Sequence, residues 1–335
     1  MKAIQLKKFG IENLTVVEEK KPSPGPHEVL IRVEAASINF IDLATARGHY
    51  NPSIPLPRIP ISDGAGVVEA AGSEVTRWKK GDRVMVNFYQ KWLSGKRSLQ
   101  AFQSQTGQAT QGVLAEYTCI HEEALVRIPD YLSSEEASTL PIAGVTAWNG
   151  LFNYGELKAG QTLVTQGSGG VSVFALQLAK AAGVKVIATS SSDEKLDKLK
   201  KWGADELINY SQHKEWHEEV LRLTHEEGAD ATLDIGGAQT IKSAMLAVKP
   251  HGFVGLVGFL GGNILPVDFF RAVPFMITIQ GISVGSRECF EDLVRALEVS
   301  RLHPVIDTVF PIEKTQEAYR LMESGKFSGK IVVKI

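Results

Sequence analysis

The chain has 335 residues, more than one hydrophobic core usually supports, so two domains are expected. Hydrophobic residues make up 44% of it and charged residues 22%, and a formal net charge of −2 gives no electrostatic reason to expect nucleic acid or an anionic membrane as a partner. There is no evident signal peptide and no apolar run of the ~20 residues that cross a membrane, so a cytoplasmic location is expected.

The first 129 residues have the sequence pattern of an all-β region. Short apolar runs at residues 29–33, 66–68, 83–86 and 125–128 are separated by turns rich in Pro, Gly and Ser. Residues 90–112, rich in Gln, Ser and Gly, are expected to form a loop inside this region. Loops of that length are usually functional or mobile.

After residue 129 strands and helices alternate. Ser133 is placed to cap a helix. Strands are then predicted at residues 162–166, 185–189, 206–209, 231–235, 252–257 and 277–284, with helices at 171–182, 194–202, 216–226 and 240–248. Such alternation predicts βαβ units and a parallel sheet. The tail adds helices at residues 289–300 and 314–324 and a last strand at 331–335.

The sharpest local feature is a glycine cluster between a strand and a helix. Gly167, Gly169 and Gly170 follow the first of these strands directly, and Val171 opens the helix. Glycines there allow a tight turn and let the backbone approach a pyrophosphate lying over the helix N-terminus. The second strand, about 20 residues on, completes the context of a dinucleotide site. The alternative is a glycine-rich turn that binds nothing.

Two other motifs of the strand–turn–helix kind are excluded. Ser168 cannot be the serine of a hydrolase nucleophile elbow, because G-x-S-x-G requires glycine where the chain has Gln166. A P-loop is excluded because G-x-x-x-x-G-K-[ST] occurs nowhere in the chain.

The end of the second strand bears on the choice between NAD and NADP. An NAD site usually has Asp or Glu there to bind the ribose hydroxyls, whereas this chain has Ser190 and Ser191, followed by Lys195. These side chains can donate to a 2′-phosphate, so NADP(H) is the predicted cofactor. The serines also suit a helix N-cap, and the two roles are compatible.

One histidine pair has the spacing of a helical zinc site. His213 and His217 stand i, i+4, but the metalloprotease motif needs Glu directly after the first His, where this chain has Lys214. The pair is therefore predicted to lie on a solvated helix face.

With these motifs placed, the whole chain resembles the medium-chain dehydrogenase/reductase superfamily, and most closely its zinc-independent quinone oxidoreductase and alcohol dehydrogenase-like branch. The resemblance runs through residues 25–50, 66–84 and 115–148, the cofactor segment, and residues 329–333. It implies an α/β fold with a GroES-like β-rich catalytic domain at 1–127 and 284–335. It also implies a Rossmann domain, a doubly wound parallel sheet, at 128–283, with the active site in the cleft facing it.

The departures from the zinc-containing members concern the metal ligands. Those members place a Cys-His pair where this chain has Asn39 and Phe40, and Gly-His-Glu at the position that ends in Ser62 and Asp63. Residues 90–112 replace their cysteine-rich lobe and contain no cysteine. Zinc needs about three or four converging Cys, His or carboxylate ligands, which Asp63 alone cannot supply. The prediction is an enzyme with no metal.

By position, the resemblance implies further cofactor contacts. Tyr210 would flank the 2′-phosphate together with Lys195, and Lys330 is a weaker candidate. A packing role is the alternative for Asn39, Tyr210 and Phe259. The residues implied to border the nicotinamide are Asn39, Thr146, Gly258, Phe259, Gly285 and Ser286.

Hydride transfer leaves negative charge on the substrate's oxygen, and without zinc hydrogen-bond donors must stabilise it. Tyr50 is the predicted proton donor or oxyanion partner, and Asn39 is predicted to position the nicotinamide or the substrate. The alternative for Tyr50 is a half-buried tyrosine that caps a turn. His49 is expected to be a solvated loop residue, and Asp42 and Asp63 are expected to stabilise the loop.

The predicted activity is NADPH-dependent reduction of a quinone or an α,β-unsaturated carbonyl, in which conjugation spreads the developing charge. Two other functions stay open: a zinc-free alcohol dehydrogenase working in the oxidative direction, and a non-catalytic NADPH-binding protein. The expected partner is a small carbonyl or quinone substrate, and a homodimer is implied by the resemblance only.

Overall fold

The computed structural model describes all 335 residues, which form two compact units. The first unit comprises Met1–Val145 and Val284–Ile335, and the second comprises Thr146–Ser283. None of the helices combines the length and the apolar character that a membrane span requires.

The first unit is built around a seven-stranded sheet with the order β14-β15-β3-β4-β5-β7, in which β6 also pairs with β3. A separate antiparallel pair is formed by β1 and β2. Because β15 lies between β14 and β3, the two chain segments of this unit share one sheet. The strands are β1 (Lys2–Leu6), β2 (Leu14–Glu18), β3 (Glu28–Ile38), β4 (Asp63–Ala71), β5 (Arg83–Val86), β6 (Tyr117–His121), β7 (Leu125–Arg127), β14 (Ile306–Pro311) and β15 (Lys330–Lys334).

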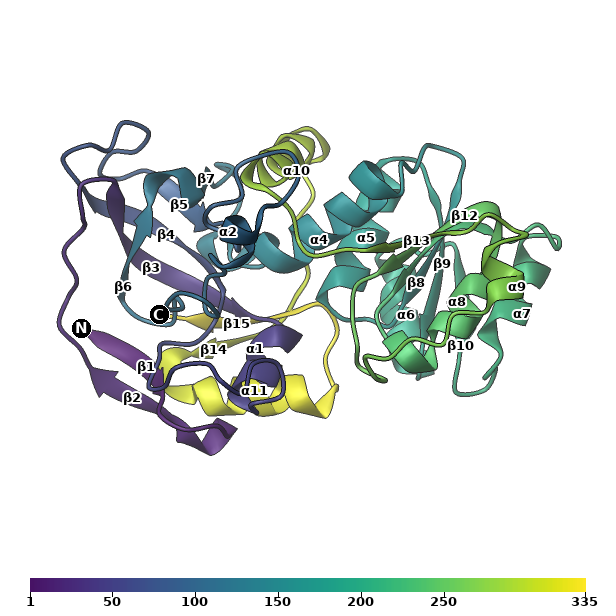
Figure 1. The fold of residues 1–335 in the computed structure, drawn as a ribbon, viewed down its shortest axis with the longest axis horizontal. Coiled ribbons are helices and arrows are strands. Elements are labelled where there is room, and N and C mark those ends of the chain that lie inside the picture. The colour runs from purple at the N-terminus through teal and green to yellow at the C-terminus, as the bar shows by residue number, and fades with distance from the viewer. The chain divides into compact units, whose positions relative to one another are not determined.

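The helices of the first unit are α1 (Phe40–Ala46), α2 (Leu99–Phe102), α3 (Ser134–Ala137), α10 (Arg287–Ser300) and α11 (Thr315–Ser324). In Figure 1, α1 and α11 lie side by side below the sheet. α11 buries Thr315, Ala318 and Tyr319, which share one helix face at i, i+3 and i+4. Ala318 and Tyr319 join the core that the strands build with residues such as Val84 and Val333.

The second unit is a six-stranded sheet with the order β10-β9-β8-β11-β12-β13, and every neighbouring pair is parallel. In Figure 1, α5 and α6 lie to the left of this sheet and α7, α8 and α9 to its right, which is the doubly wound arrangement. The strands are β8 (Thr162–Gln166), β9 (Lys185–Ser190), β10 (Glu206–Asn209), β11 (Ala229–Asp234), β12 (Val248–Leu256) and β13 (Thr278–Gly281). The helices are α4 (Val145–Trp148), α5 (Gly170–Ala181), α6 (Asp193–Lys201), α7 (Trp216–Leu223), α8 (Ile241–Ala247) and α9 (Phe269–Ala272).

The predicted alternation of strands and helices is confirmed, with shifts at the ends of several elements. β8 and β10 have the predicted bounds, whereas β12 begins at Val248 and β13 already ends at Gly281. β14 and α1 were not predicted. β14 is an edge strand whose outward-facing residues are polar or exposed, and α1 is only seven residues long, so neither carries a strong apolar period.

The loop at residues 90–112 contains only the short helix α2, but its middle is buried. Thr106 and Gln108 are 0% and 4% exposed. Thr106 N–H donates to the carbonyl of Phe88, and a Cβ on Gly112 would come within 2.2 Å of the Pro60 carbonyl oxygen. The loop is therefore packed closely onto the chain around residue 60.

The first crossing between the units lies at Val145, later in the chain than the predicted boundary at residue 127. Residues 134–144 belong to the first unit because α3 packs against β3, β4 and β15 and the π-helical turn Leu140–Gly144 packs against β4. The capping box formed by Ser133 and Glu136 starts this segment, as the predicted cap at Ser133 indicates. The second crossing is at Val284.

Candidate cofactor and active site

The turn that follows β8 leaves open space at the start of α5. Gly167 has a φ of +76°, and a Cβ built on Gly167 or Gly169 would meet no heavy atom within 4 Å. Gly169 is the N-cap of α5 and no side chain caps the helix, so the first N–H groups of α5, from Gly170 and Val171 onward, are available to an anion. This cradle fits the pyrophosphate of a dinucleotide.

Ser172 lies in the first turn of α5, directly after the glycine cluster and Val171. Its Oγ donates to the Gln166 carbonyl oxygen at 2.6 Å, and the side chain is 3% exposed. The hydroxyl ties the first turn of α5 to the end of β8. The serine therefore adds a buried hydrogen bond and leaves the cradle unobstructed.

At the end of β9, two of the three predicted phosphate donors lie at or near the surface. Ser191 is exposed and Lys195 is half-buried, whereas Ser190 is only 1% exposed and enclosed in the sheet. The predicted helix cap is present at Ser192, whose Oγ accepts from the Lys195 N–H. Tyr210, 38% exposed, lies beside this strand end because its N–H donates to the Ser190 carbonyl oxygen.

The carboxylate nearest in sequence to this strand end is hydrogen-bonded to the neighbouring strand β10. Asp193 Oδ1 accepts from Asn209 Nδ2 at 2.6 Å, in the first turn of α6. Ser191 directly follows β9, and the exposed Asp193 and Glu194 come after it in the first turn of α6, with Lys195.

Three other predicted cofactor residues belong to the second unit. Thr146 is buried in α4, and Phe259 is 36% exposed in the segment after β12. A Cβ on Gly258 would stand 2.2 Å from the Ile235 carbonyl oxygen. Close packing is therefore by itself a sufficient reason for glycine at this position.

In the first unit, Asn39 is held by charged groups on both sides of its amide. Its Nδ2 donates to Asp63 Oδ2 at 2.8 Å, and its Oδ1 accepts from Lys330 Nζ at 2.5 Å. Lys330 also donates to the Ile38 carbonyl oxygen and lies 3.8 Å from Asp63 Oδ2. The three side chains are at most 8% exposed and join β3, β4 and β15, and we call them the Asn39 network.

Asp42 extends this network through α1. It closes a capping box at the start of the helix by accepting from the Asn39 N–H, and its other oxygen accepts from the N–H and the Oγ of Ser62. Ile61, directly before Ser62, has a φ of +68°, which is strained for a β-branched residue. The bonds to Asp42 help to hold this conformation.

Burial dominates the electrostatics of these groups. It raises the pKa of Asp42 to about 6, although hydrogen bonds from Asn39 and Ser62 favour the ionised form. Burial likewise raises the pKa of Asp63 and lowers that of Lys330, and the attraction between the two opposes both shifts. The cluster is therefore an incompletely neutralised set of buried charges.

Tyr50 follows α1 at the rim of the first unit and is 37% exposed. Burial and the neighbouring Tyr89 raise the pKa of Tyr50, while a hydrogen bond with Gln105 and the charge of Arg97 oppose this. The phenol is therefore protonated at neutral pH and can donate a hydrogen bond. His49 beside it is exposed, as expected.

Gly285 and Ser286 have structural roles at the start of α10. A Cβ on Gly285 would stand 2.7 Å from both Cys289 Sγ and Val145 Cγ1. Ser286 is the N-cap of α10, and its Oγ accepts from the Cys289 N–H at 3.1 Å.

No group of three or more His, Cys, Asp or Glu side chains is arranged to hold a metal ion. The predicted solvated face for the histidine pair is wrong for His217, which is 9% exposed with its Nδ1 3.3 Å from Ser243 Oγ. Trp216 and Val220, its neighbours on α7, are also buried, so the helix is turned to place this face inward. His213 has an exposed side chain.

Sequence reasoning did not find several residues around these sites. Lys330 was predicted only as a cofactor contact, because no local motif marks a lysine that pairs with residues almost 300 positions away. Gln105 beside Tyr50 lies in the predicted loop, and Arg58 is enclosed near Asp42. The Pro-Arg-Ile-Pro context of Arg58 carries no recognisable signal.

Comparison with known proteins matches both units. Residues 25–130 match the alcohol dehydrogenase GroES-like domain family, and residues 170–299 match the zinc-binding dehydrogenase family. A zinc-type alcohol dehydrogenase-like protein of Schizosaccharomyces pombe is 38% identical over 97% of this chain and 96% of its own length. A quinone oxidoreductase of Pseudomonas aeruginosa is 35% identical over 80% of this chain and 76% of its own.

Solved structures agree with this fold over the whole chain. An NAD-dependent alcohol dehydrogenase has a TM-score of 0.90 at 33% identity, with both chains covered completely. A mycobacterial protein in complex with NADPH has a TM-score of 0.85 at 28% identity, again with complete coverage of both chains. Similar structures thus include one described with each of the two nicotinamide cofactors.

Proposed function

Because the chain belongs to the medium-chain dehydrogenase/reductase superfamily and is a pyridine-nucleotide-dependent oxidoreductase, we propose that it uses NADPH to reduce a quinone or an α,β-unsaturated carbonyl without zinc. The observation that carries the cofactor part is the end of β9. Ser191 and Lys195 lie there in place of a carboxylate, beside an open glycine cradle. A 2′-phosphate is compatible with these donors, whereas an acidic side chain would repel it.

The substrate part of the proposal rests on the donor set of the first unit. Where zinc-containing relatives would need several ligands, the chain presents an amide, a lysine and carboxylates already joined by hydrogen bonds. Such a set can hold Asn39 in place to orient the nicotinamide or the substrate, and the hydrogen bond to a delocalised enolate or hydroquinone anion comes from Tyr50. NADPH supplies the hydride when bound, and the phenol of Tyr50 donates to the substrate oxygen.

The direct test is a comparison of two assays with the purified protein. We expect NADPH oxidation with quinones or enones and no appreciable reduction of NADP with simple alcohols. Turnover of alcohols alone would overturn the proposed substrate class, and tight NADPH binding with no turnover would support a non-catalytic role. Elemental analysis is expected to show less than stoichiometric zinc.

Replacing Tyr50 with phenylalanine is expected to lower kcat for the reduction by on the order of tenfold to 100-fold, because a donor to the developing oxyanion is lost. The dissociation constant for NADPH should not change. Tyr154→Phe, at an exposed tyrosine of the second unit, is the control. Equal activity of Tyr50→Phe and the control would remove Tyr50 from the mechanism.

Replacing Lys195 with glutamate is expected to raise the dissociation constant for NADPH about tenfold, equivalent to ~1.4 kcal/mol, and to leave that for NADH nearly unchanged. The reason is that only NADPH carries a 2′-phosphate. Lys198→Glu, on the same helix, controls for the change in charge. Equal weakening of both cofactors would contradict a contact between Lys195 and the phosphate.

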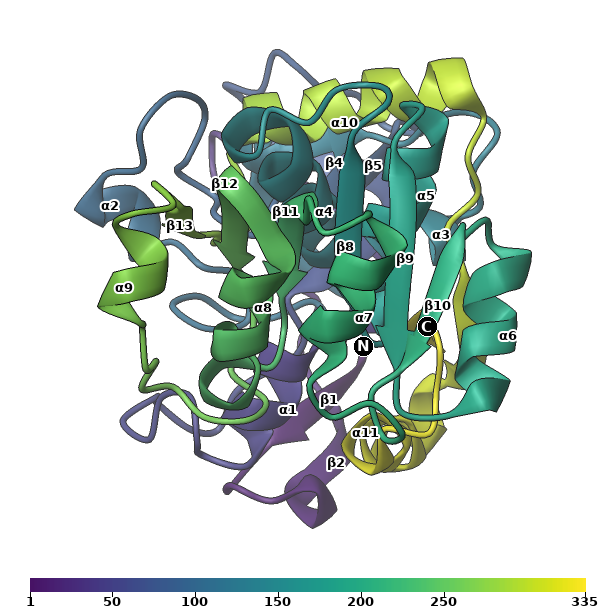
Figure 2. The same ribbon diagram turned by 90° about the vertical axis from the view of Figure 1, so that its right-hand side faces the viewer.

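We further infer that the protein forms a homodimer through the β13 edge of the second unit. β13 is the last strand of its sheet, and Figure 2 shows it with α9 at one side of that sheet. The segment before it is apolar and exposed, with Ile264 at 84%, Phe269 at 63% and Phe270 at 80%. An unpaired edge beside such a patch suits the same edge of a second copy.

Ile264→Lys combined with Phe270→Lys is expected to give a monomer in sedimentation velocity. Val299→Lys, which charges an equally exposed apolar residue on α10, should leave the dimer intact. A monomeric parent protein, or a dimer that survives both lysines, would rule out this interface.

A further inference from the structure

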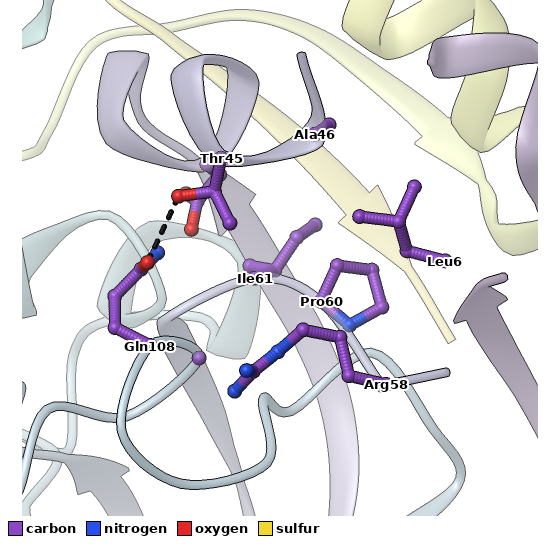
Figure 3. A pocket seen from close by; sticks show the side chains of 9 residues that line it. Leu6, Thr45, Ala46, Arg58, Pro60, Ile61 and Gln108 are labelled. Carbon is purple, nitrogen blue, oxygen red and sulfur yellow. Dashed lines mark hydrogen bonds between the residues drawn. The ribbon is translucent and has the colours of Figure 1, made fainter. Parts of the chain in front are cut away.

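A small cavity lies beside Asp42 in the first unit. Its polar wall is formed by Asp42, Thr45, Arg58 and Gln108, and Leu6 and Ile61 contribute apolar wall. Its volume is about 10 Å³, which is close to the space that one water molecule needs. In Figure 3, the amide of Gln108 points up toward Thr45, and the guanidinium of Arg58 lies lower in the view.

Two buried donors at this cavity have no protein acceptor. Arg58 is 4% exposed, and its Nη2 donates to the Thr110 carbonyl oxygen, but nothing accepts from its Nε. Gln108 is also 4% exposed, and its Oε1 accepts from Thr45 Oγ1 at 2.9 Å, but nothing accepts from its Nε2. A buried N–H without an acceptor costs about 1–3 kcal/mol, so two of them at one small cavity indicate an acceptor that is not a protein group.

The opposite wall supplies an acceptor. The Asp42 carboxylate is 3% exposed and already accepts from Asn39 and Ser62, yet two oxygens together have about four acceptor sites. Arg58 itself forms no ion pair. Burial disfavours its charged form and therefore lowers its pKa. A ligand that accepts two hydrogen bonds and donates one to Asp42 would satisfy both walls.

We propose that one internal water molecule binds in this cavity, accepts from Arg58 Nε and Gln108 Nε2, and donates to Asp42. Water has the required two acceptor sites and at least one donor, and it fits the volume. A halide or another small anion would satisfy Arg58 and Gln108, but it would stand against the Asp42 carboxylate. This inference does not depend on the proposed enzymatic function.

The water would link Arg58 to the Asn39 network. The charged and titratable groups around Asp42 are Asp63, Lys330 and Tyr319 in addition to Arg58. Lys330 is the cation that acts on both carboxylates, and Arg58 shares only the cavity wall with Asp42. Through the water, Arg58 would act as a positioning residue on Asp42, which accepts from the Asn39 N–H.

The first experiment is a crystal structure at a resolution that shows ordered water, with a second crystal soaked in bromide. The expected result is a water peak within hydrogen-bond distance of Arg58 Nε, Gln108 Nε2 and Asp42, without anomalous signal from bromide. An anomalous peak in the cavity would show an anion site instead. A cavity without density, or with density that contacts only one of the three groups, would overturn the proposal.

Two variants distinguish the effect of the Arg58 charge from the effect of the bound water. Arg58→Met removes the cation and one donor to the water and is expected to raise the pKa of Asp42, so the loss of stability with rising pH extends to a higher pH than in the parent. Gln108→Met fills the donor's space and keeps the cation, and it should lose the water peak in the crystal with a smaller change in the pH profile.

Arg83→Met is the matched control, because Arg83 also donates to a main-chain carbonyl but lies away from the cavity. The measurement is the unfolding temperature between pH 4 and pH 8. Coincident pH profiles for Arg58→Met and Arg83→Met would refute the link to Asp42. If Arg58→Met does not fold, the crystal structure of Gln108→Met still decides whether the water depends on that amide.

Discussion

Replacing Gly169 with valine is expected to lower the affinity for NADPH by on the order of 1000-fold, equivalent to ~4 kcal/mol, with almost no change in the unfolding temperature. The open space at this position explains both parts of the result. A Cβ on Gly169 meets no heavy atom of the protein within 4 Å, and its φ of −75° and ψ of 177° are allowed for valine. The added methyl groups would occupy the volume that the pyrophosphate needs above α5.

Fluorescence titration with NADPH, together with a thermal melt, measures the two quantities. Gly169→Ala should weaken binding less than Gly169→Val, because it adds one carbon instead of three. Unchanged affinity in the valine variant would contradict the placement of the pyrophosphate. A lower unfolding temperature with unchanged affinity would mean that Gly169 is needed only for folding.

Replacing Lys330 with methionine is expected to lower the free energy of unfolding by about 3–5 kcal/mol at pH 8, because two buried carboxylates lose their nearest cation. Lys330 donates to Ile38 and Asn39 and lies 3.8 Å from Asp63. Lys334→Met, on the same strand but with an exposed side chain paired to Glu135, is the control and should cost less than about 1 kcal/mol.

The loss should depend on pH in a defined direction. A carboxyl group whose pKa is raised by folding stabilises the fold fully below its unfolded pKa, near 4, and loses that contribution as the pH rises through its folded pKa. For Asp42 the folded pKa is about 6 in the parent protein, so this contribution is lost as the pH rises from about 4 to about 6. The pKa of Asp63 is also raised. Without Lys330 both values rise further, so the variant should recover part of its loss at pH 5.

Urea unfolding at pH 5 and pH 8 tests this expectation, and Asp63→Asn in the same chain should rescue the variant at pH 8. Equal losses at the two pH values, or no rescue by Asp63→Asn, would show that Lys330 stabilises the fold through packing of its aliphatic stem alone.

Local patterns in the sequence were sufficient to predict the second unit. The run from Gln166 to Val171 contains a strand end, three glycines and a helix start within a few residues, and each of these signals is local. β8 consequently has the predicted bounds, and the cradle lies where the glycines indicate. Ser190 is the exception, because enclosure at a strand end depends on neighbouring strands that its own sequence does not reveal.

The first unit was predicted less completely, because its contacts join distant parts of the chain. Asn39 was singled out by position, but its partners Asp63 and Lys330 come from two other strands. The solvated face predicted for the i, i+4 histidine pair rested on Lys214 in place of the Glu of a metalloprotease motif, whereas His217 is buried because Trp216 and Val220 orient α7. Loop packing at Gln108 likewise depends on tertiary contacts with α1.

The position of β15 between β14 and β3 has a consequence for the order in which the protein assembles during synthesis. The second unit, Thr146–Ser283, is one continuous stretch and is synthesised before Lys330–Lys334. The sheet of the first unit lacks an interior strand until Lys330–Lys334 emerges. Until then, the edges of β3 and β14 that pair with β15 have no partner strand. Asn39 receives its lysine only with this strand, so the polar centre of the first unit is completed after the whole second unit has been synthesised.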